Sequence, residues 1–212
     1  MAAVEQDCEA LEYPSKALKA NRKVVLAAVS ENGLALEYAS RALKADQKVA
    51  LAAVSENGLA LEYASKGPTD DELWRYSEEH IRELEVVMAA VKEVVLAAVN
   101  NNGLALEYAD EYRMRKEVVL AAVKQHYRAL AYASKALRGD QEVVMAAVNK
   151  SGYALNYASR VLKDNQAVVM AAVNNNGFAL AYASVKLKGD RKVVMAAVNK
   201  CGYALNYASD EL

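Results

Sequence analysis

The sequence predicts an all-α protein, an α-solenoid of about eight 25-residue helix-turn-helix repeats with one longer inserted helix. Three observations support this fold class: a six-residue apolar block recurs along the chain, a block containing Leu-x-Tyr-Ala follows each copy, and a glycine usually separates the two. With 54% hydrophobic and 25% charged residues, the chain also has enough apolar side chains for a buried core.

The first block of each repeat predicts a short, buried helix. It reads Val-Val-Leu-Ala-Ala-Val at 24–29, and its counterparts are 49–54, 94–99, 118–123, 143–148, 168–173 and 193–198. A helix of this composition is apolar on nearly all sides, so other helices must cover it. An Asx residue precedes most copies and is expected to cap the helix N-terminus: Asn21, Asp46, Asp140, Asn165 and Asp190.

The second block predicts an amphipathic, solvent-facing helix, such as one over 34–43 with Leu36, Ala39 and Leu43 on one stripe. We expect the glycine before it, such as Gly33, to end the first helix in a left-handed conformation. Helices this short are marginal alone, so their stability must come from repeats that stack on one another. The tyrosine of each block is expected to form a structural column along the stack.

An insertion interrupts the array. Tyr63 and Tyr108 are 45 residues apart instead of 25, so about 20 extra residues lie between the third and fourth repeats. A capping box at 69–72 and an amphipathic pattern from 73 to 91 predict a long helix that runs into the next apolar block. The expected organisation is therefore a three-repeat arm (1–66), an inserted helical segment (67–92) and a five-repeat arm (93–212), joined as one continuous solenoid.

The insertion also contains Trp74 and Tyr76. Two interpretations of the tryptophan stay open: it covers the flank of the first arm, or it anchors an interface with a partner. A smaller departure occurs in the fifth repeat, where His126 and Tyr127 replace the usual Asn-Gly pair. We expect a different turn there.

Charge is distributed unevenly. Residues 1–106 carry 11 basic and 17 acidic residues, whereas residues 107–212 carry 15 basic and 10 acidic residues. This asymmetry reflects either drift between repeats or two ends that bind different partners or each other, as in head-to-tail self-association. One position of the second block changes along the chain from acidic to neutral: it is Glu12, Glu37, Glu62 and Glu107 first, and then Ala131, Asn156, Ala181 and Asn206.

Nothing in the sequence points to catalysis. The two histidines, His80 and His126, are isolated, and the two cysteines, Cys8 and Cys201, lie at opposite ends of the chain. No glycine-rich phosphate loop follows a strand pattern. We therefore expect no enzyme activity, no catalytic or metal-binding residues and no cofactor. Free thiols favour a reducing, cytoplasmic compartment, and neither a signal sequence nor a membrane span is expected.

The function that this pattern favours is a non-enzymatic module for protein–protein interaction or assembly, because a solenoid exposes a large, variable surface. The candidate partner-binding residues are Trp74, Tyr76, Glu12, Glu37, Glu62 and Glu107. An alternative is a structural or accessory subunit of a larger complex. A repeat-type nucleic-acid binder is disfavoured, because the pI of about 6.2 and the acidic position do not provide a basic surface.

The paired blocks, as at 23–40 (Lys-Val-Val-Leu-Ala-Ala-Val-Ser-Glu-Asn-Gly-Leu-Ala-Leu-Glu-Tyr-Ala-Ser), resemble the repeats of the family called domain of unknown function 4116. Nearly the whole chain outside the insertion takes part in this resemblance. It implies a tandem array of helical repeats, and it brings no established activity, cofactor or site residue with it.

Overall fold

A computed structural model describes residues 15–64 and 78–209, and for residues 78–87 it describes the backbone alone. The chain forms two compact units, Met1–Tyr112 (unit 1) and Arg113–Leu212 (unit 2), and each is described by itself. The described residues are helical and contain no strand, which confirms the all-α repeat fold. The division into 1–66, 67–92 and 93–212 stays a prediction.

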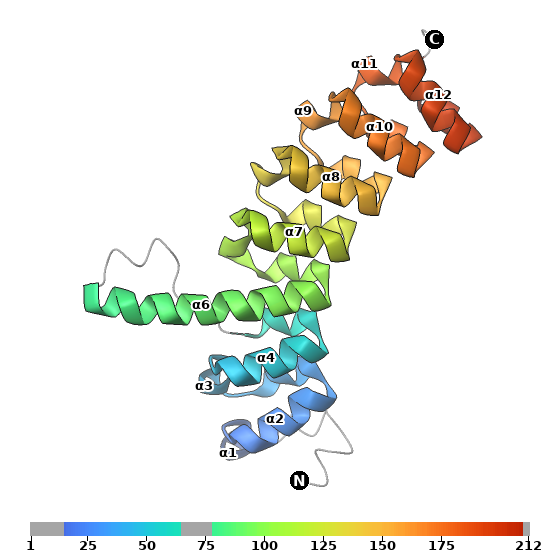
Figure 1. The fold of residues 1–212 in the computed structure, drawn as a ribbon. Helices are drawn as coiled ribbons and strands as arrows, with labels where there is room; N and C mark the ends of the chain where they lie inside the picture. The colour runs from blue at the N-terminus through green and yellow to red at the C-terminus, as the bar shows by residue number, and fades with distance from the viewer. Residues whose placement is uncertain (1–14, 65–77, 210–212) are drawn as a thin grey trace. The chain divides into compact units, whose positions relative to one another are not determined.

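Unit 1 contains repeats built from one longer α-helix, one 3-10 helix and a single-turn connecting helix (Figure 1). Its longer helices are α2 (Arg22–Glu31), α4 (Gln47–Glu56) and α6 (Glu78–Asn101); its 3-10 helices are η2 (Gly33–Tyr38), η3 (Gly58–Glu62) and η4 (Gly103–Tyr108); its single-turn helices are α1 (Lys16–Lys19) and α3 (Arg41–Lys44). Helix α4 packs between α2 and α6. The 24-residue helix α6 confirms a long helix that runs from the insertion into the next apolar block, whereas the predicted capping box at 69–72 lies outside the described residues.

Unit 2 repeats the same plan. Its longer helices are α7 (Lys116–Gln125), α8 (Gln141–Lys150), α10 (Gln166–Asn175) and α12 (Arg191–Lys200); its 3-10 helices are η6 (Tyr127–Tyr132), η8 (Gly152–Tyr157), η9 (Gly177–Tyr182) and η10 (Gly202–Tyr207); its short connecting helices are η7 (Leu137–Gly139), α9 (Arg160–Lys163) and α11 (Val185–Lys188). A further 3-10 helix, η5 (Asp110–Met114), precedes α7 and takes the place of a connecting helix. Helices α7, α8, α10 and α12 pack in chain order.

The longer helices form the buried layer, as the sequence predicts. One face of each helix is fully buried, as with Val25, Ala28 and Val29 of α2, and neighbouring residues such as Val24 and Ala27 are half-buried. All five predicted Asx caps are confirmed, since each side chain accepts a hydrogen bond from the backbone in the first turn of its helix. For example, the Asp140 carboxylate accepts from the backbone N–H of Val143 at 3.1 Å.

The prediction of one amphipathic helix over 34–43 is wrong, because the segment is split into a 3-10 helix and a separate helical turn. The carbonyl of Leu36 accepts from the N–H of Ala39 at 3.1 Å, and the N–H of Ser40 donates to the carbonyl of Lys19 in the preceding repeat at 2.8 Å. A continuous α-helix would need that Ser40 amide for the Leu36 carbonyl. The contact between repeats therefore breaks the helix, although Leu36 and Leu43 are both buried as expected.

The predicted role of the glycines is also wrong. Gly33, Gly58, Gly152 and Gly177 do not have a φ in the left-handed region; instead, each of the four contacts the following repeat closely. A Cβ atom at Gly33, Gly58, Gly152 or Gly177 would lie 2.2–2.4 Å from a backbone carbonyl oxygen of the next α-helix, far inside van der Waals contact. Glycine is required because the repeats approach closely, and not because the chain turns sharply.

The expectation of a different turn at His126 is wrong as well. His126 has φ −143° and ψ 118°, close to the −145° and 107° of Asn32 in the second repeat. Its Nδ1 accepts from the N–H of Arg128 at 3.2 Å, and the Asn32 side chain accepts from the N–H of Leu34 at 3.0 Å. An imidazole nitrogen therefore replaces the amide oxygen, and the turn is preserved.

Candidate functional site

The 3-10 helices present the part of each repeat that varies most in side-chain chemistry. Their third and fourth residues are Ala and Leu throughout and are buried in the repeats that another described repeat follows, as with Ala35 and Leu36 of η2. The residue before the tyrosine is exposed in unit 1, where it is Glu37, Glu62 or Glu107. We call these three carboxylates the acidic row. The uniform backbone thus holds one exposed carboxylate per repeat.

Tyrosines flank the acidic row. Tyr38, Tyr63 and Tyr108 are half-buried. Burial raises the pKa of Tyr63, and the negative charges of Glu37 and Glu62 raise it further. Burial and then Glu62 and Glu107 raise the pKa of Tyr108 in the same way. The row therefore acts electrostatically across neighbouring repeats, and the two phenols stay protonated hydrogen-bond donors at neutral pH.

Lysine ammonium groups lie near two of these rings. The Lys44 ammonium lies 6.0 Å from the ring centroid of Tyr63, and that of Lys19 lies 5.8 Å from the ring centroid of Tyr38. Both distances are within the range of a weak cation–π attraction. Tyr63 thus lies close to a cation and within the electrostatic influence of two carboxylates.

Unit 2 replaces the acidic row with an aromatic surface. The residue after the turn glycine is aromatic in three repeats, and in two of them its ring meets the tyrosine of the next repeat edge to face. Tyr153 pairs with Tyr182 at a centroid distance of 6.4 Å, and Phe178 pairs with Tyr207 at 6.2 Å. We call these two pairs the aromatic ladder; in each pair a ring contacts a ring of the following repeat.

Arg128 occupies the corresponding position at the start of the aromatic ladder. Its Nε donates to the phenol oxygen of Tyr127 at 3.3 Å, and its guanidinium lies 5.9 Å from the Tyr127 ring centroid. The hydrogen bond to Tyr127 is the main cause that raises the pKa of Arg128. Within the described residues Arg128 forms no ion pair, so its charge faces solvent.

A shallow groove of about 240 Å³ lies beside Arg128 and is lined by Tyr127, Arg128, Tyr153, Asn156, Tyr157 and Tyr182. One lining residue, Asn156, accepts a hydrogen bond at its carbonyl oxygen from the Lys163 ammonium at 2.7 Å. Burial lowers the pKa of Lys163, and the neighbouring Arg160 lowers it further. The groove combines rings, an amide and cations. Its volume is below the roughly 300–1,000 Å³ of pockets for small molecules.

The structure places only part of the predicted site. Glu37, Glu62 and Glu107 share one exposed face of unit 1. Glu12, Trp74 and Tyr76 lie outside the described residues. Sequence reasoning missed Arg128 and the residue that follows the turn glycine, although Tyr153, Phe178 and Tyr203 recur there at the repeat interval and gave the signal.

The described residues offer no arrangement for metal chemistry. No group of three or more His, Cys, Asp or Glu residues among them could hold a metal ion. His126 is committed to the turn of its repeat, and Cys201 is a half-buried free thiol. In residues 15–64 and 78–209, no helix combines the length and the apolar composition that a membrane crossing requires.

Comparison with known proteins gives one match. A family model described as a domain of unknown function (DUF4116) matches residues 21–67, 91–138, 115–163, 140–188 and 165–212. The overlapping segments follow the repeat interval and cover most of the chain outside the insertion. No curated protein and no solved structure matches the chain.

Proposed function

Because this chain belongs to the DUF4116 family of helical repeats, we propose that it is a non-enzymatic module for protein–protein interaction or assembly that binds partners on its 3-10 helices. One observation carries the proposal: the backbone and the buried side chains of these helices are uniform, whereas their exposed side chains differ between the units. A constant scaffold with variable exposed residues is how repeat proteins achieve specific binding.

The two units offer different chemistry to a partner. The acidic row of unit 1 suits a segment that carries Lys or Arg, because its carboxylates recur once per repeat along one face. The groove of unit 2 suits a segment with a carboxylate for Arg128 and an apolar or aromatic side chain for the rings of Tyr153 and Tyr182. Aromatic residues and arginine are also the side chains most enriched in binding hot spots.

Charge reversal with a matched control tests the acidic row. The test variant is Glu37→Lys with Glu62→Lys, and the control is Glu31→Lys with Glu56→Lys. All four glutamates are exposed and belong to the same two repeats, but Glu31 and Glu56 lie at the ends of α2 and α4 instead of on the 3-10 helices. Partners captured from the native source by cross-linking are quantified by mass spectrometry.

The expected result is loss of at least one captured protein by the test variant and its retention by the control. Equal loss from both variants would indicate general charge attraction, and no loss from either would refute a role for the acidic row. Arg128→Ala with Tyr153→Ala tests the groove in the same assay. A partner that co-purifies at fixed stoichiometry regardless of all these changes would favour the alternative, an accessory subunit held by another surface.

A further inference from the structure

Unit 2 carries a strong positive charge. Residues 113–209 contain 15 basic and 5 acidic residues, whereas the whole chain has a formal charge of −1. The sequence disfavours a nucleic-acid binder because of the pI of the whole chain and the acidic position of the second block. The three glutamates of the acidic row all belong to unit 1, so that objection does not apply to unit 2.

One face of unit 2 combines cations with aromatic rings. We define the ring face as the turns and 3-10 helices of three successive repeats, residues 124–132, 149–157 and 174–182. These segments contain three exposed cations, Lys124, Arg128 and Lys150, and no Asp or Glu. The equivalent segments of unit 1, 30–38, 55–63 and 100–108, contain five Glu and no Lys or Arg. Equivalent segments of the repeat therefore carry opposite charges in the two units.

The acidic residues of unit 2 lie away from the ring face. Within 113–209 all five are in or next to the first turn of a long helix: Glu117, Asp140, Glu142, Asp164 and Asp190. Asp140 and Glu142 both accept from the Lys116 ammonium at 2.8 Å, and Asp164 accepts from the Ser184 hydroxyl. A ten-residue helix is about 15 Å long, which exceeds the Debye length of about 8 Å at physiological ionic strength. These carboxylates therefore do little to neutralise the ring face.

Two further cations border the ring face. The Lys163 ammonium donates to the carbonyl oxygen of Asn156 at 2.7 Å, which places it against η8. Burial lowers the pKa of Lys163, and the charge of the nearby Arg160 lowers it further. An anion bound beside these two residues would offset the repulsion between them.

The groove of the ring face has the composition of a site for an unstacked base. Tyr153 is 37% exposed and lines the groove together with Tyr182. Rings of this kind bind single strands because every base has a face that stacks on them. Asn156 stands where unit 1 has Glu37, so an amide that can pair with a base edge replaces a carboxylate. The Arg128 guanidinium beside the groove is oriented by its hydrogen bond to a phenol, and arginine suits phosphate oxygens.

We propose that the ring face of unit 2 binds single-stranded nucleic acid. A base enters the groove and stacks on Tyr153, and Arg128 and the neighbouring cations contact phosphates. A duplex fits less well, because its bases are stacked on one another and do not reach the rings. An acidic protein segment fits less well too, because its carboxylates match the cations alone, whereas the rings and amides match a base. This inference goes beyond the proposed function, since it adds another class of ligand, and it does not rest on the acidic row.

A labelled oligouridylate of about 12 nucleotides is a suitable probe, because single-strand sites commonly span roughly 4–16 nucleotides. Its binding to the full chain is measured by fluorescence anisotropy. We expect saturable binding at low salt with a Kd of about 1–100 μM. Contacts to about three to five phosphates predict a slope of log affinity against log salt concentration of roughly −2 to −3.5.

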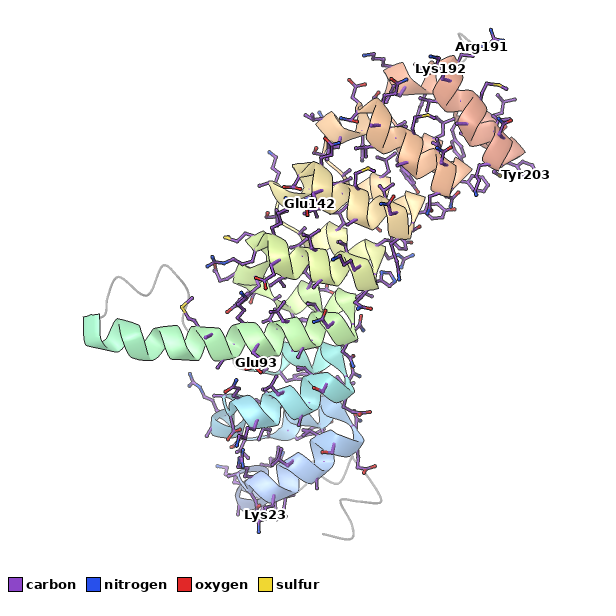
Figure 2. The ribbon with its side chains drawn as sticks, viewed as in Figure 1. Lys23, Glu93, Glu142, Arg191, Lys192 and Tyr203 are labelled. Atoms are coloured by element: carbon purple, nitrogen blue, oxygen red, sulfur yellow. The ribbon has the colours of Figure 1, made fainter. Side chains whose placement is uncertain are left out.

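Two pairs of variants locate the binding site. Arg128→Ala and Lys192→Ala each remove one exposed cation from unit 2. Lys192 lies in the first turn of α12, and Figure 2 shows it at the opposite end of its repeat from Tyr203, which follows the turn. We expect Arg128→Ala to weaken binding about fivefold or more and Lys192→Ala less than about twofold. Tyr153→Ala should weaken binding about tenfold, and Tyr153→Phe, which keeps the ring, should leave it nearly unchanged.

Several results would overturn the inference. They are absence of saturable, salt-sensitive binding, equal weakening by Arg128→Ala and Lys192→Ala, equal weakening by Tyr153→Ala and Tyr153→Phe, and tighter binding of a duplex of the same length. An oligoglutamate of equal charge that binds as tightly as the oligouridylate would also overturn it, because an acidic protein segment would then be the better ligand. Glu37→Lys with Glu62→Lys should not weaken binding of the oligouridylate. Failure of this inference is therefore separate from failure of the acidic row to bind a protein.

Discussion

Two glycines in identical local sequences should respond in opposite ways to the same substitution. Gly152 and Gly202 each begin the hexapeptide Gly-Tyr-Ala-Leu-Asn-Tyr and the 3-10 helix that it forms. A Cβ atom at Gly152 would lie 2.3 Å from the carbonyl oxygen of Ala172, and the neighbouring Asn176 Cβ would lie at 3.1 Å. At Gly202 the same atom would meet nothing within 4 Å.

The expected difference follows from these distances. An Ala side chain at 152 forces α10 away from η8, and overpacking of this kind costs about 1–3 kcal/mol. At 202 no atom must move, and the loss of backbone freedom in the unfolded chain stabilises the protein by about 0.4–1 kcal/mol. The free energies of unfolding of Gly152→Ala and Gly202→Ala should therefore differ by roughly 1.5–4 kcal/mol.

Urea unfolding followed by circular dichroism at 222 nm measures this difference. The midpoint of Gly152→Ala should fall, and that of Gly202→Ala should stay constant or rise, with similar m-values for both variants. Equal destabilisation by the two changes would mean that glycine is needed for the conformation of the hexapeptide. A neutral effect at 152 would mean that the repeats are not in contact there.

Substitutions at three other contacts, each with a comparison variant, test the packing between repeats. Asn175→Ala removes two hydrogen bonds to the preceding turn, at 2.7 and 3.1 Å, and should cost about 1–3 kcal/mol in the same assay, whereas Asn174→Ala, at an exposed neighbour, should cost almost nothing. Leu155→Ala should cost about 2–5 kcal/mol, and Leu205→Ala at its exposed equivalent less than about 1 kcal/mol. Asp140→Asn should keep the cap and lose only an exposed ion pair, at about 0.2–1 kcal/mol, and Asp140→Ala should lose a further 0.5–2 kcal/mol, roughly. The hydrogen bond from Lys116 lowers the pKa of Asp140. The ion pair therefore contributes fully to the free energy of unfolding above the ordinary aspartate pKa, and this contribution disappears as the pH falls through the lowered pKa. The stability of Asp140→Asn should accordingly approach that of the natural chain in acid titrations below about pH 4. A stability difference between Asp140→Asn and the natural chain that persists at low pH would contradict the ion pair. Equal destabilisation by Asn175→Ala and Asn174→Ala, or by Leu155→Ala and Leu205→Ala, would contradict the contacts between repeats.

The sequence predicted correctly what depends on periodic burial and on local capping. The apolar blocks specified the buried helices, and Asn21 and Asp46 showed where these helices begin. The prediction from sequence was wrong where a residue makes its decisive contact with a neighbouring repeat. The Asn-Gly pairs resemble a helix stop, but the partner of Gly33 is the carbonyl oxygen of Ala53, in the following repeat. Only the stacking distance shows why a side chain is excluded there.

The prediction of one continuous second helix failed for the same reason. The stripe of Leu36, Ala39 and Leu43 is buried as the pattern requires, but the spacing does not reveal that Ser40 donates its amide to Lys19 of another repeat. In the candidate site, the acidic row is visible in the sequence because its residues are identical. The aromatic ladder of Tyr153 and Phe178 is harder to find, because its members vary in type and pair across repeats.

The central claim is that each repeat is stabilised by the repeat stacked on it and not by its own sequence. Hydrogen exchange followed by mass spectrometry tests this claim most directly, because the amides of 153–157 and 203–207 belong to the same residue sequence, Tyr-Ala-Leu-Asn-Tyr, and so have matched intrinsic rates. We predict exchange at least about tenfold slower in 153–157, which the next repeat covers, than in 203–207. Equal exchange in the two segments would contradict the account.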